Sequence, residues 1–482
     1  MNYRAVVNVL GRILFLEAIL MVLPIIVDLV YGEGTWWAFL IPLGCLLLIS
    51  IPIIVFVKPK EILLYAREGF VITALAWVLV SLVGAVPFVI SKEIPNFVDA
   101  LFESVSGFTT TGASILTDIE ALSHSMLFWR SFSHWIGGMG ILVFVLALIP
   151  NQEGGSMHIL RAESTGPNVG KIVSKMNITA RILYAIYTVL TLVCFIFLVA
   201  GKMPVFDAIC HSLGTAGTGG FSVYNTSIGH YNNTYFEMVI AVFMFIFGVN
   251  FNVYYLILIG KFTDVLKTEE VRTYFIIVIL ATLIIALDIM TLYENFGEAI
   301  RHSFFQVTSI ISTTGYTSTD FNAWPTFAKI ILFMLMAIGS CAGSTAGGLK
   351  ISRLIILSKS SITDMRKMLH PRQVIRTKLD GDHISEDTIR NTKTYFVAYV
   401  GITVLSILLI SIEKYGGFET NFSAVIACFN NVGPGFELVG PLSNYSGYSI
   451  FSKLILSIDM LAGRLEIFPI LLLFTPTTWH KN

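Results

Sequence analysis

Residues 214–222 read G-T-A-G-T-G-G-F-S and lie between two strongly apolar runs. The stretch carries no charge, and nearly all of its residues are Gly, Thr, Ser or Ala. A flexible linker would explain this composition in isolation, because such residues are common in turns and loops. Whether the stretch is more than a linker depends on what the rest of the chain builds around it.

The composition places the chain in a membrane. Of its 482 residues 55% are hydrophobic and only 13% are charged, whereas a soluble domain has about 25% charged residues. Ten apolar runs are each long enough to cross a hydrocarbon core of about 30 Å. The predicted spans are 9–31, 35–57, 71–91, 127–149, 181–200, 235–260, 272–292, 325–357, 394–412 and 449–476. We therefore expect an all-α polytopic membrane protein.

Charge placement predicts the orientation. With both termini in the cytoplasm, most of the 31 Lys and Arg residues fall on the cytoplasmic side, as the positive-inside rule requires. Lys+Arg equals Asp+Glu, so the net charge gives no reason to expect a nucleic-acid partner. The dispersed cysteines match no metal-binding pattern, and HExxH, GxSxG and nucleotide-binding fingerprints are absent. These observations argue against an enzyme.

Four long external segments, near 93–126, 201–234, 293–324 and 413–448, repeat one pattern. Each begins with a stretch that suits a half-length helix and then reaches a glycine-centred segment. Aligned on that glycine, the segments are Thr110-Thr111-Gly112-Ala113-Ser114, Thr215-Ala216-Gly217-Thr218-Gly219, Thr313-Thr314-Gly315-Tyr316-Thr317 and Asn431-Val432-Gly433-Pro434-Gly435. A Phe precedes each glycine by ten or eleven residues, at Phe102, Phe206, Phe304 and Phe422.

The chain therefore contains four units of span, pore helix, glycine segment and span, which we expect in a pseudo-fourfold arrangement. An N-terminal two-helix hairpin precedes them. The predicted divisions are the hairpin at 1–60 and the pore repeats at 61–150, 151–262, 263–358 and 359–482.

One glycine segment alone would be a plain connector, but four in the same register indicate an ion-selectivity filter. Irregular backbone at membrane depth is tolerated where it is buried in protein or lines a water-filled cavity. There, successive carbonyl oxygens can replace the hydration shell of a cation. Glycine supplies the backbone angles that turn those oxygens inward, and the negative C-terminal end of a half-helix favours a cation.

These residues resemble the Trk/Ktr/HKT superfamily of potassium transporters. The segment 215–219, T-A-G-T-G, is similar to the potassium-channel filter T-V-G-Y-G, and 134–140, H-W-I-G-G-M-G, with 339–348, G-S-C-A-G-S-T-A-G-G, resembles the TrkH-type branch. The resemblance covers the whole chain and implies transported K⁺ at the filter. The implied ion-binding residues are Thr110, Thr111, Gly112, Thr215, Ala216, Gly217, Thr313, Thr314, Gly315, Asn431, Val432 and Gly433.

The stretch 339–348 interrupts the span after the third filter segment. Small residues there favour either close helix packing or a broken helix, and the resemblance implies a loop that obstructs the pore. The gate would then comprise Gly343, Ser344, Thr345, Ala346, Gly347, Gly348 and Arg464. A charge inside a span is costly, so Arg464 is either a positive barrier, or the partner of an acid such as Asp459 or Glu466, or both.

The resemblance also implies a homodimer in membrane lipid and a cytosolic, NAD/ATP-binding, TrkA-like regulatory subunit. This chain itself is expected to bind no nucleotide. The polar stretches 151–179 and 358–393 are either docking surfaces for that subunit or solvated connectors. The sequence thus predicts gated potassium uptake across a bacterial cytoplasmic (inner) membrane. A K⁺/H⁺ or K⁺/Na⁺ symporter using the same filter is the alternative.

Overall fold

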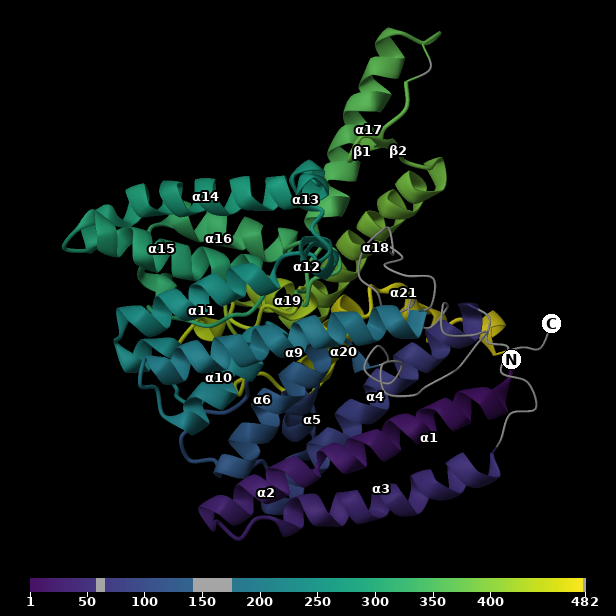
Figure 1. Ribbon diagram of the computed structural model, residues 1–482, viewed down its shortest axis with the longest axis vertical. Helices are drawn as coiled ribbons and strands as arrows, with labels where there is room; N and C mark the ends of the chain where they lie inside the picture. Colours follow the sequence, from purple (N-terminus) through teal and green to yellow (C-terminus); the bar gives the residue numbers. More distant parts are fainter. Residues whose placement is uncertain (58–65, 142–175, 374, 480–482) are drawn as a thin grey trace.

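The computed structural model describes residues 1–57, 66–141, 176–373 and 375–479. This part of the chain is almost wholly helical (Figure 1). Its strands are β1 (Lys378–Leu379) and β2 (Asp382–His383), which pair antiparallel in one short hairpin. Six of the described helices are long and apolar enough to cross a membrane, or seven spans if one bent pair is included. The predicted class, an all-α polytopic membrane protein, is confirmed.

The N-terminal helices form an antiparallel hairpin along one edge of the molecule (Figure 1). They are α1 (Tyr3–Leu20), α2 (Val22–Tyr31) and α3 (Trp37–Phe56). α1 packs against α3 and against α4 (Ala66–Ser91) of the following unit. The outer face of α3 leaves Leu48 and Phe56 about four-fifths exposed, at 77% and 82%. Such a face suits lipid contact.

Each of the four units begins with a long helix that can span the bilayer. These helices are α4, α9 (Met176–Ala200), α14 (Glu269–Ile289) and α18 (Glu386–Ile410). Each is followed by a short helix that is too short to cross, because 12 to 16 residues extend only about 18–24 Å. The short helices are α5 (Phe97–Phe108), α10 (Val205–Gly217), α15 (Phe296–Ile311) and α19 (Phe418–Phe429).

The short helices carry polar signals at their first turns and buried C-terminal halves. Asn96 caps α5 through its side chain, and Asn295 caps α15 in the same way. Each first turn also contains an acid that complements the helix dipole. These acids are Asp99, Asp207, Glu298 and Glu419. The four C-terminal ends are therefore left to meet in the interior.

The last helix of every unit is shorter than the sequence predicted. These helices are α6 (His124–Gly138), α11 (Thr234–Phe247), α16 (Thr326–Ile338) and α20 (Ile450–Arg464). Hydropathy predicted one continuous span for each, and for three of them this is wrong. α11 meets α12 (Phe251–Leu258) at a bend of 90°, and α16 ends at the loop 339–350. α20 ends before α21 (Phe468–Leu473), while the predicted run 127–149 continues beyond the described residues.

The breaks arise because apolar sequence does not exclude irregular backbone whose polar groups find partners inside the protein. At the α11–α12 bend, the carbonyl of Gly248 accepts from Cys341 N and the N–H of Phe251 donates to Gly343 O. At the α20–α21 break, Glu466 and Ile467 both have positive φ, 58° and 67°. No hydropathy profile records these contacts.

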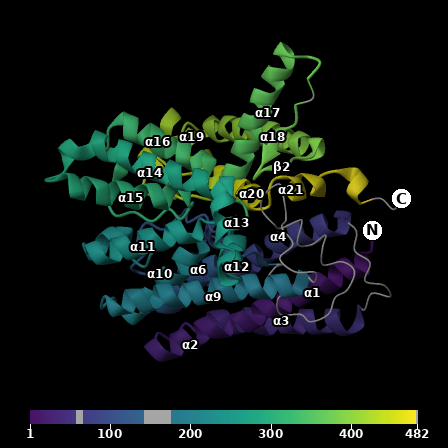
Figure 2. The same cartoon turned by 45° about the horizontal axis from the view of Figure 1, so that its top comes forward.

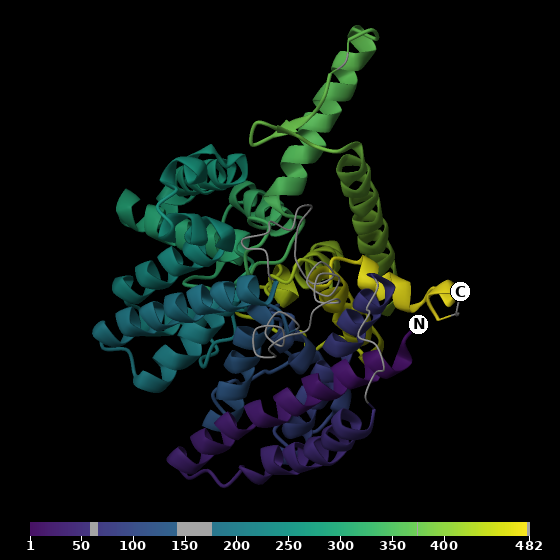
Figure 3. The ribbon, with the colours of Figure 1, turned by 45° about the vertical axis from the view of Figure 1, so that its right-hand side comes forward.

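One arm projects from the helical body. It consists of α17 (Ile351–Leu369), the β1–β2 hairpin and the first turns of α18 (Figure 2). Figure 3 shows α17 standing clear of the other helices. α13 (Phe262–Lys267) precedes α14 near the base of this arm. Met368 and Leu369 at the end of α17 are 80% and 75% exposed.

Candidate ion-binding site

The four short helices end in the same backbone structure. Each helix has a residue with a positive φ of 54–57° at its C-cap, in α10, or directly after the cap, in the other three, and the glycine two residues later has a positive φ of 80–94°. The N–H of the residue between them donates to a carbonyl five residues earlier, at 2.8–2.9 Å. The resulting triplets are Thr110–Gly112, Thr218–Gly220, Thr313–Gly315 and Asn431–Gly433.

The second triplet corrects the sequence alignment by three residues. Thr215, Ala216 and Gly217 were predicted to form it, but they lie in the last turn of α10. The hydroxyl of Thr215 donates to His211 O, as it would inside any helix. The stretch 214–222 contains both T-A-G and T-G-G, so counting from Phe206 selected the wrong one. The predicted Phe spacing accordingly fits three of the four triplets.

The triplets follow one another around a closed ring. A Cβ built on Gly112 would collide with the carbonyl oxygen of Gly219, and one on Gly220 with that of Thr314. In the same way, a Cβ on Gly315 would collide with Val432 O, and one on Gly433 with Thr111 O. The glycines are thus required twice, by their positive φ and by this close approach. All four line one cavity of about 80 Å³.

The first residue of each triplet is fully buried and carries a side-chain oxygen. Among the described residues, Thr110 Oγ1 and Asn431 Oδ1 have no hydrogen-bond partner. Leaving such an acceptor buried costs about 1–3 kcal/mol, which a bound cation would offset. Thr218 Oγ1 instead donates to Gly217 O at 2.6 Å. Together with the carbonyls, these oxygens form a ligand set suited to a dehydrated monovalent cation.

The predicted gate segment lies at the other end of the triplets from the cavity. Residues 339–350 are not helical and connect α16 to α17. The N–H of Gly347 donates to Thr313 Oγ1 at 2.8 Å, and a Cβ on Gly347 would collide with Asn430 O. Gly343 and Gly348 have positive φ, 70° and 79°. The broken helix is therefore what the structure shows, rather than close packing of an intact span.

Two buried, positively charged side chains donate to consecutive backbone carbonyls of this segment. Arg464 Nη1 donates to Thr345 O at 2.6 Å, and Lys350 Nζ donates to Ala346 O. Arg464 Nη2 also donates to the carbonyls of Gly137 and Gly138 at the end of α6. Arg464, at the end of α20, thus links the segment to the end of α6.

The two acids that were predicted as partners of Arg464 have other contacts. Glu466 forms an ion pair with Arg353 of α17, and Asp459 accepts from Ser406 Oγ at 2.7 Å. Arg464 is 7% exposed, and its positive charge lies against the backbone of the loop. That position suits a barrier to cations.

Sequence reasoning missed Glu270, which holds both ends of the gate segment. A single carboxylate oxygen accepts from Ala342 N at 2.7 Å and from Ser352 N at 3.1 Å. Glu270 lies in the first turn of α14, 72 and 82 residues away from these partners in the chain. An acid near the start of a predicted span was the only available signal.

A second missed feature is a buried ion pair beside the 80 Å³ cavity. Arg130 Nε lies 2.8 Å from Glu103 Oε1, and both side chains are almost fully buried. Glu103 also accepts from Ile115 N.

A sequence model of the TrkH family, described as cation transport proteins, matches residues 45–481. The chain belongs to the TrkH family. Members of this family are transporters and not enzymes, and the TrkH assignment agrees with the resemblance found in the sequence. The ring of triplets therefore lies in a protein whose family moves cations across membranes.

Individual TrkH relatives align along their whole length. The Trk system potassium uptake proteins TrkH of Escherichia coli K12 and Salmonella typhimurium are each 36% identical, over 100% of both chains. The crystal structure of the potassium transporter TrkH from Vibrio parahaemolyticus superposes with a TM-score of 0.89 at 32% identity, again covering 100% of both chains.

Proposed function

We propose that the chain is a potassium uptake protein whose four triplets form the selectivity filter. The closed ring of glycine-to-carbonyl contacts carries this proposal. The filter residues are Thr110–Gly112, Thr218–Gly220, Thr313–Gly315 and Asn431–Gly433. The names of the relatives support potassium as the ion, because two TrkH proteins so named are 36% identical to this chain over their full length.

In the proposed mechanism, a cation enters from the 80 Å³ cavity and exchanges water for protein oxygen. The carbonyls of Thr111, Gly219, Thr314 and Val432 provide one layer. The side-chain oxygens of the first residues provide a second layer below it. The C-terminal ends of the four short helices add negative potential along the axis. Each ligand is weak and neutral, so an ion can leave as well as bind.

The gate segment and Arg464 close the inner end of this pathway in our proposal. Gly347 contacts the third filter segment directly, and Arg464 and Lys350 repel a cation that reaches the inner end. Conduction then requires the segment to move away from Thr313 and Arg464. We also propose the predicted orientation, with both termini in the cytoplasm, so that the arm is cytosolic.

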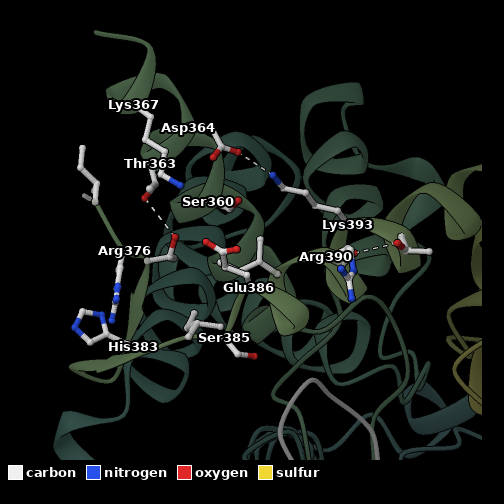
Figure 4. A pocket seen from close by; sticks show the side chains of 15 residues that line it. Ser360, Thr363, Asp364, Lys367, Arg376, His383, Ser385, Glu386, Arg390 and Lys393 are labelled. Atoms are coloured by element: carbon white, nitrogen blue, oxygen red, sulfur yellow. Dashed lines mark hydrogen bonds and ion pairs between the residues drawn. The ribbon is translucent and has the colours of Figure 1, made fainter. Parts of the chain in front are cut away.

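The arm is where we place the nucleotide-binding, TrkA-like partner. It carries a cavity of about 720 Å³ between α17, the hairpin and α18 (Figure 4). Its lining is charged and includes Lys367, Arg376 and Arg390. A hydrogen bond from Lys393 lowers the pKa of Asp364 at this cavity.

The arm is also connected to the gate segment. Asp380 in the hairpin accepts from Glu269 N at 2.6 Å, and Glu269 pairs with Lys359 of α17. The next residue, Glu270, holds both ends of the gate segment. A partner that moves the arm would therefore act on the gate through Glu269 and Glu270. We also propose the homodimer that the family resemblance implies.

The deciding experiment is ion flux in liposomes that contain the purified chain, with Rb⁺, Na⁺ and pH followed together. We expect Rb⁺ flux without net proton movement, and a Gly220→Ser variant that loses most of its preference for Rb⁺ over Na⁺. Gly401→Ser is the matched control, because a Cβ at Gly401 meets no atom within 4 Å. Unchanged preference in Gly220→Ser would refute the filter. Flux that occurs only with H⁺ or Na⁺ would instead indicate the symporter.

A further inference from the structure

The second filter segment lacks the pair of hydroxyl side chains that supports the first and third segments. Behind the first segment, Thr109 and Thr111 form a hydroxyl pair at 2.8 Å. Behind the third, Ser312 and Thr314 form the equivalent pair at 2.7 Å. The corresponding positions in the second segment, 217 and 219, are both glycine. Something else must hold the carbonyl of residue 219 in place.

His134 of α6 occupies the space that those side chains would fill. Its side chain is fully buried. The three atoms nearest to a Cβ built on Gly219 all belong to the His134 imidazole, and all lie closer than carbon atoms can approach. Gly219 is not among the residues with positive φ. The missing side chain at 219 is therefore explained by the imidazole and not by backbone geometry.

The hydrogen bonds of His134 define its tautomer. The backbone N–H of Phe221 can only donate, and it lies 3.1 Å from Nε2. Nε2 must accept, so the ring proton is on Nδ1, which donates to Gly107 O at 2.7 Å. Each nitrogen of a neutral imidazole is thereby used once. The ring links the last turn of α5 to the residue that follows Gly220.

A second side chain of α6, one turn earlier, holds the same region. Arg130 Nη1 donates to Ser222 O at 3.2 Å, and its guanidinium lies 4.0 Å from the centroid of the Phe221 ring. The imidazole of His134 lies 4.3 Å from the same ring. Phe221 is thus fixed through both its backbone and its side chain.

We propose that His134 is a positioning residue for ion selection, which sets the second filter segment through its bond to Phe221 N. This inference rests on the proposed filter. In it, the imidazole supplies from α6 the rigidity that the first and third segments obtain from their own side chains. His134, Gly217 and Gly219 are then a matched set, since a Cβ on Gly217 would also collide with the His134 backbone.

Two conservative variants separate the two bonds of the imidazole. The side-chain amide of Asn reaches about as far as Nδ1 and can still donate to Gly107 O. The amide of Gln reaches about as far as Nε2, and its oxygen can still accept from Phe221 N. We expect His134→Gln to keep the Rb⁺/Na⁺ preference and His134→Asn to lower it by about 2- to 10-fold, the effect of one hydrogen bond. The reverse order would overturn the proposal and leave His134 as a structural tie between helices.

A compensating pair tests the matched set. Thr occupies the middle position in the first and third segments, so the backbone accepts it there. We expect Gly219→Thr alone to lose preference through collision with the imidazole. His134→Ala alone should also lose preference. The double variant should recover at least part of it, because neighbouring sites are non-additive. A double variant as poor as the sum of the two would overturn the proposal.

The Gly220→Ser variant distinguishes this inference from the filter itself. Loss of preference in Gly220→Ser with an unaltered His134→Asn would reject only the role of His134. An unaltered Gly220→Ser would reject the filter on which that role depends. Gel filtration and thermal unfolding of each purified variant show which samples are folded, and the comparison of His134→Gln with His134→Asn is made between folded proteins.

Discussion

Replacing Arg464 by Ala should open the inner end of the pathway. The proposed opening separates the gate segment from Arg464, so the relevant contact is the 2.6 Å bond from Nη1 to Thr345 O. A hydrogen bond to a charged group contributes about 1.5–3 kcal/mol. Since about 1.4 kcal/mol is a factor of ten in an equilibrium constant, the closed-to-open ratio should fall about 10- to 100-fold. Loss of the positive charge lowers the barrier further.

The assay is Rb⁺ efflux from liposomes that contain the chain without any partner protein. The efflux rate of Arg464→Ala should rise by up to the same 10- to 100-fold. Arg464→Lys is the matched control, because it keeps the charge and loses the forked geometry, so its rate should rise less. A folded Arg464→Ala protein that conducts no faster than the unaltered chain would refute the reasoning. Equal rates in the Ala and Lys variants would show that the positive charge at position 464 does not contribute to the barrier.

Three further predictions follow from single contacts. Glu270→Ala should raise the Rb⁺ flux measured without a partner protein, because it releases both ends of the gate segment. Glu270→Gln keeps an accepting oxygen and should raise this flux less. A lower flux in Glu270→Ala would contradict the prediction. Thr215→Val should leave the Rb⁺/Na⁺ preference unchanged, since Thr215 lies in the last turn of α10 and its hydroxyl donates to His211 O. A changed preference would restore the original alignment. Glu103→Ala should destabilise the protein by about 3–5 kcal/mol, because it leaves Arg130 buried and without its acidic partner. Thermal unfolding in detergent measures this, with Glu120→Ala at an exposed position as the control. Equal stability of the two variants would show that the ion pair is dispensable.

The sequence predicted the membrane fold well because its signals are local. Apolar runs, half-length helices and recurring glycine segments can each be read within about 30 residues. The interruption at 339–348 was one of the two alternatives that the sequence left open, because its several Gly residues destabilise a helix wherever it packs. Hydropathy failed at the breaks after α11 and α20, because a run remains apolar when its helix is broken.

The choice within residues 214–222 required the tertiary structure. Both T-A-G and T-G-G satisfy the local pattern, and composition does not say where α10 ends. Contact of Gly220 with the carbonyl of Thr314 decides between them, and that contact joins residues about a hundred positions apart.

For the site as a whole, some features could be read from the sequence and others required the tertiary structure. The amino-acid sequence by itself determined that four glycine segments would meet at membrane depth, because each segment carries its own helix and its own left-handed glycine. Only the tertiary structure brings His134 against Gly219 and Glu270 against the gate segment. These pairs depend on how whole helices pack, and packing between distant elements leaves no periodic signal in a single chain.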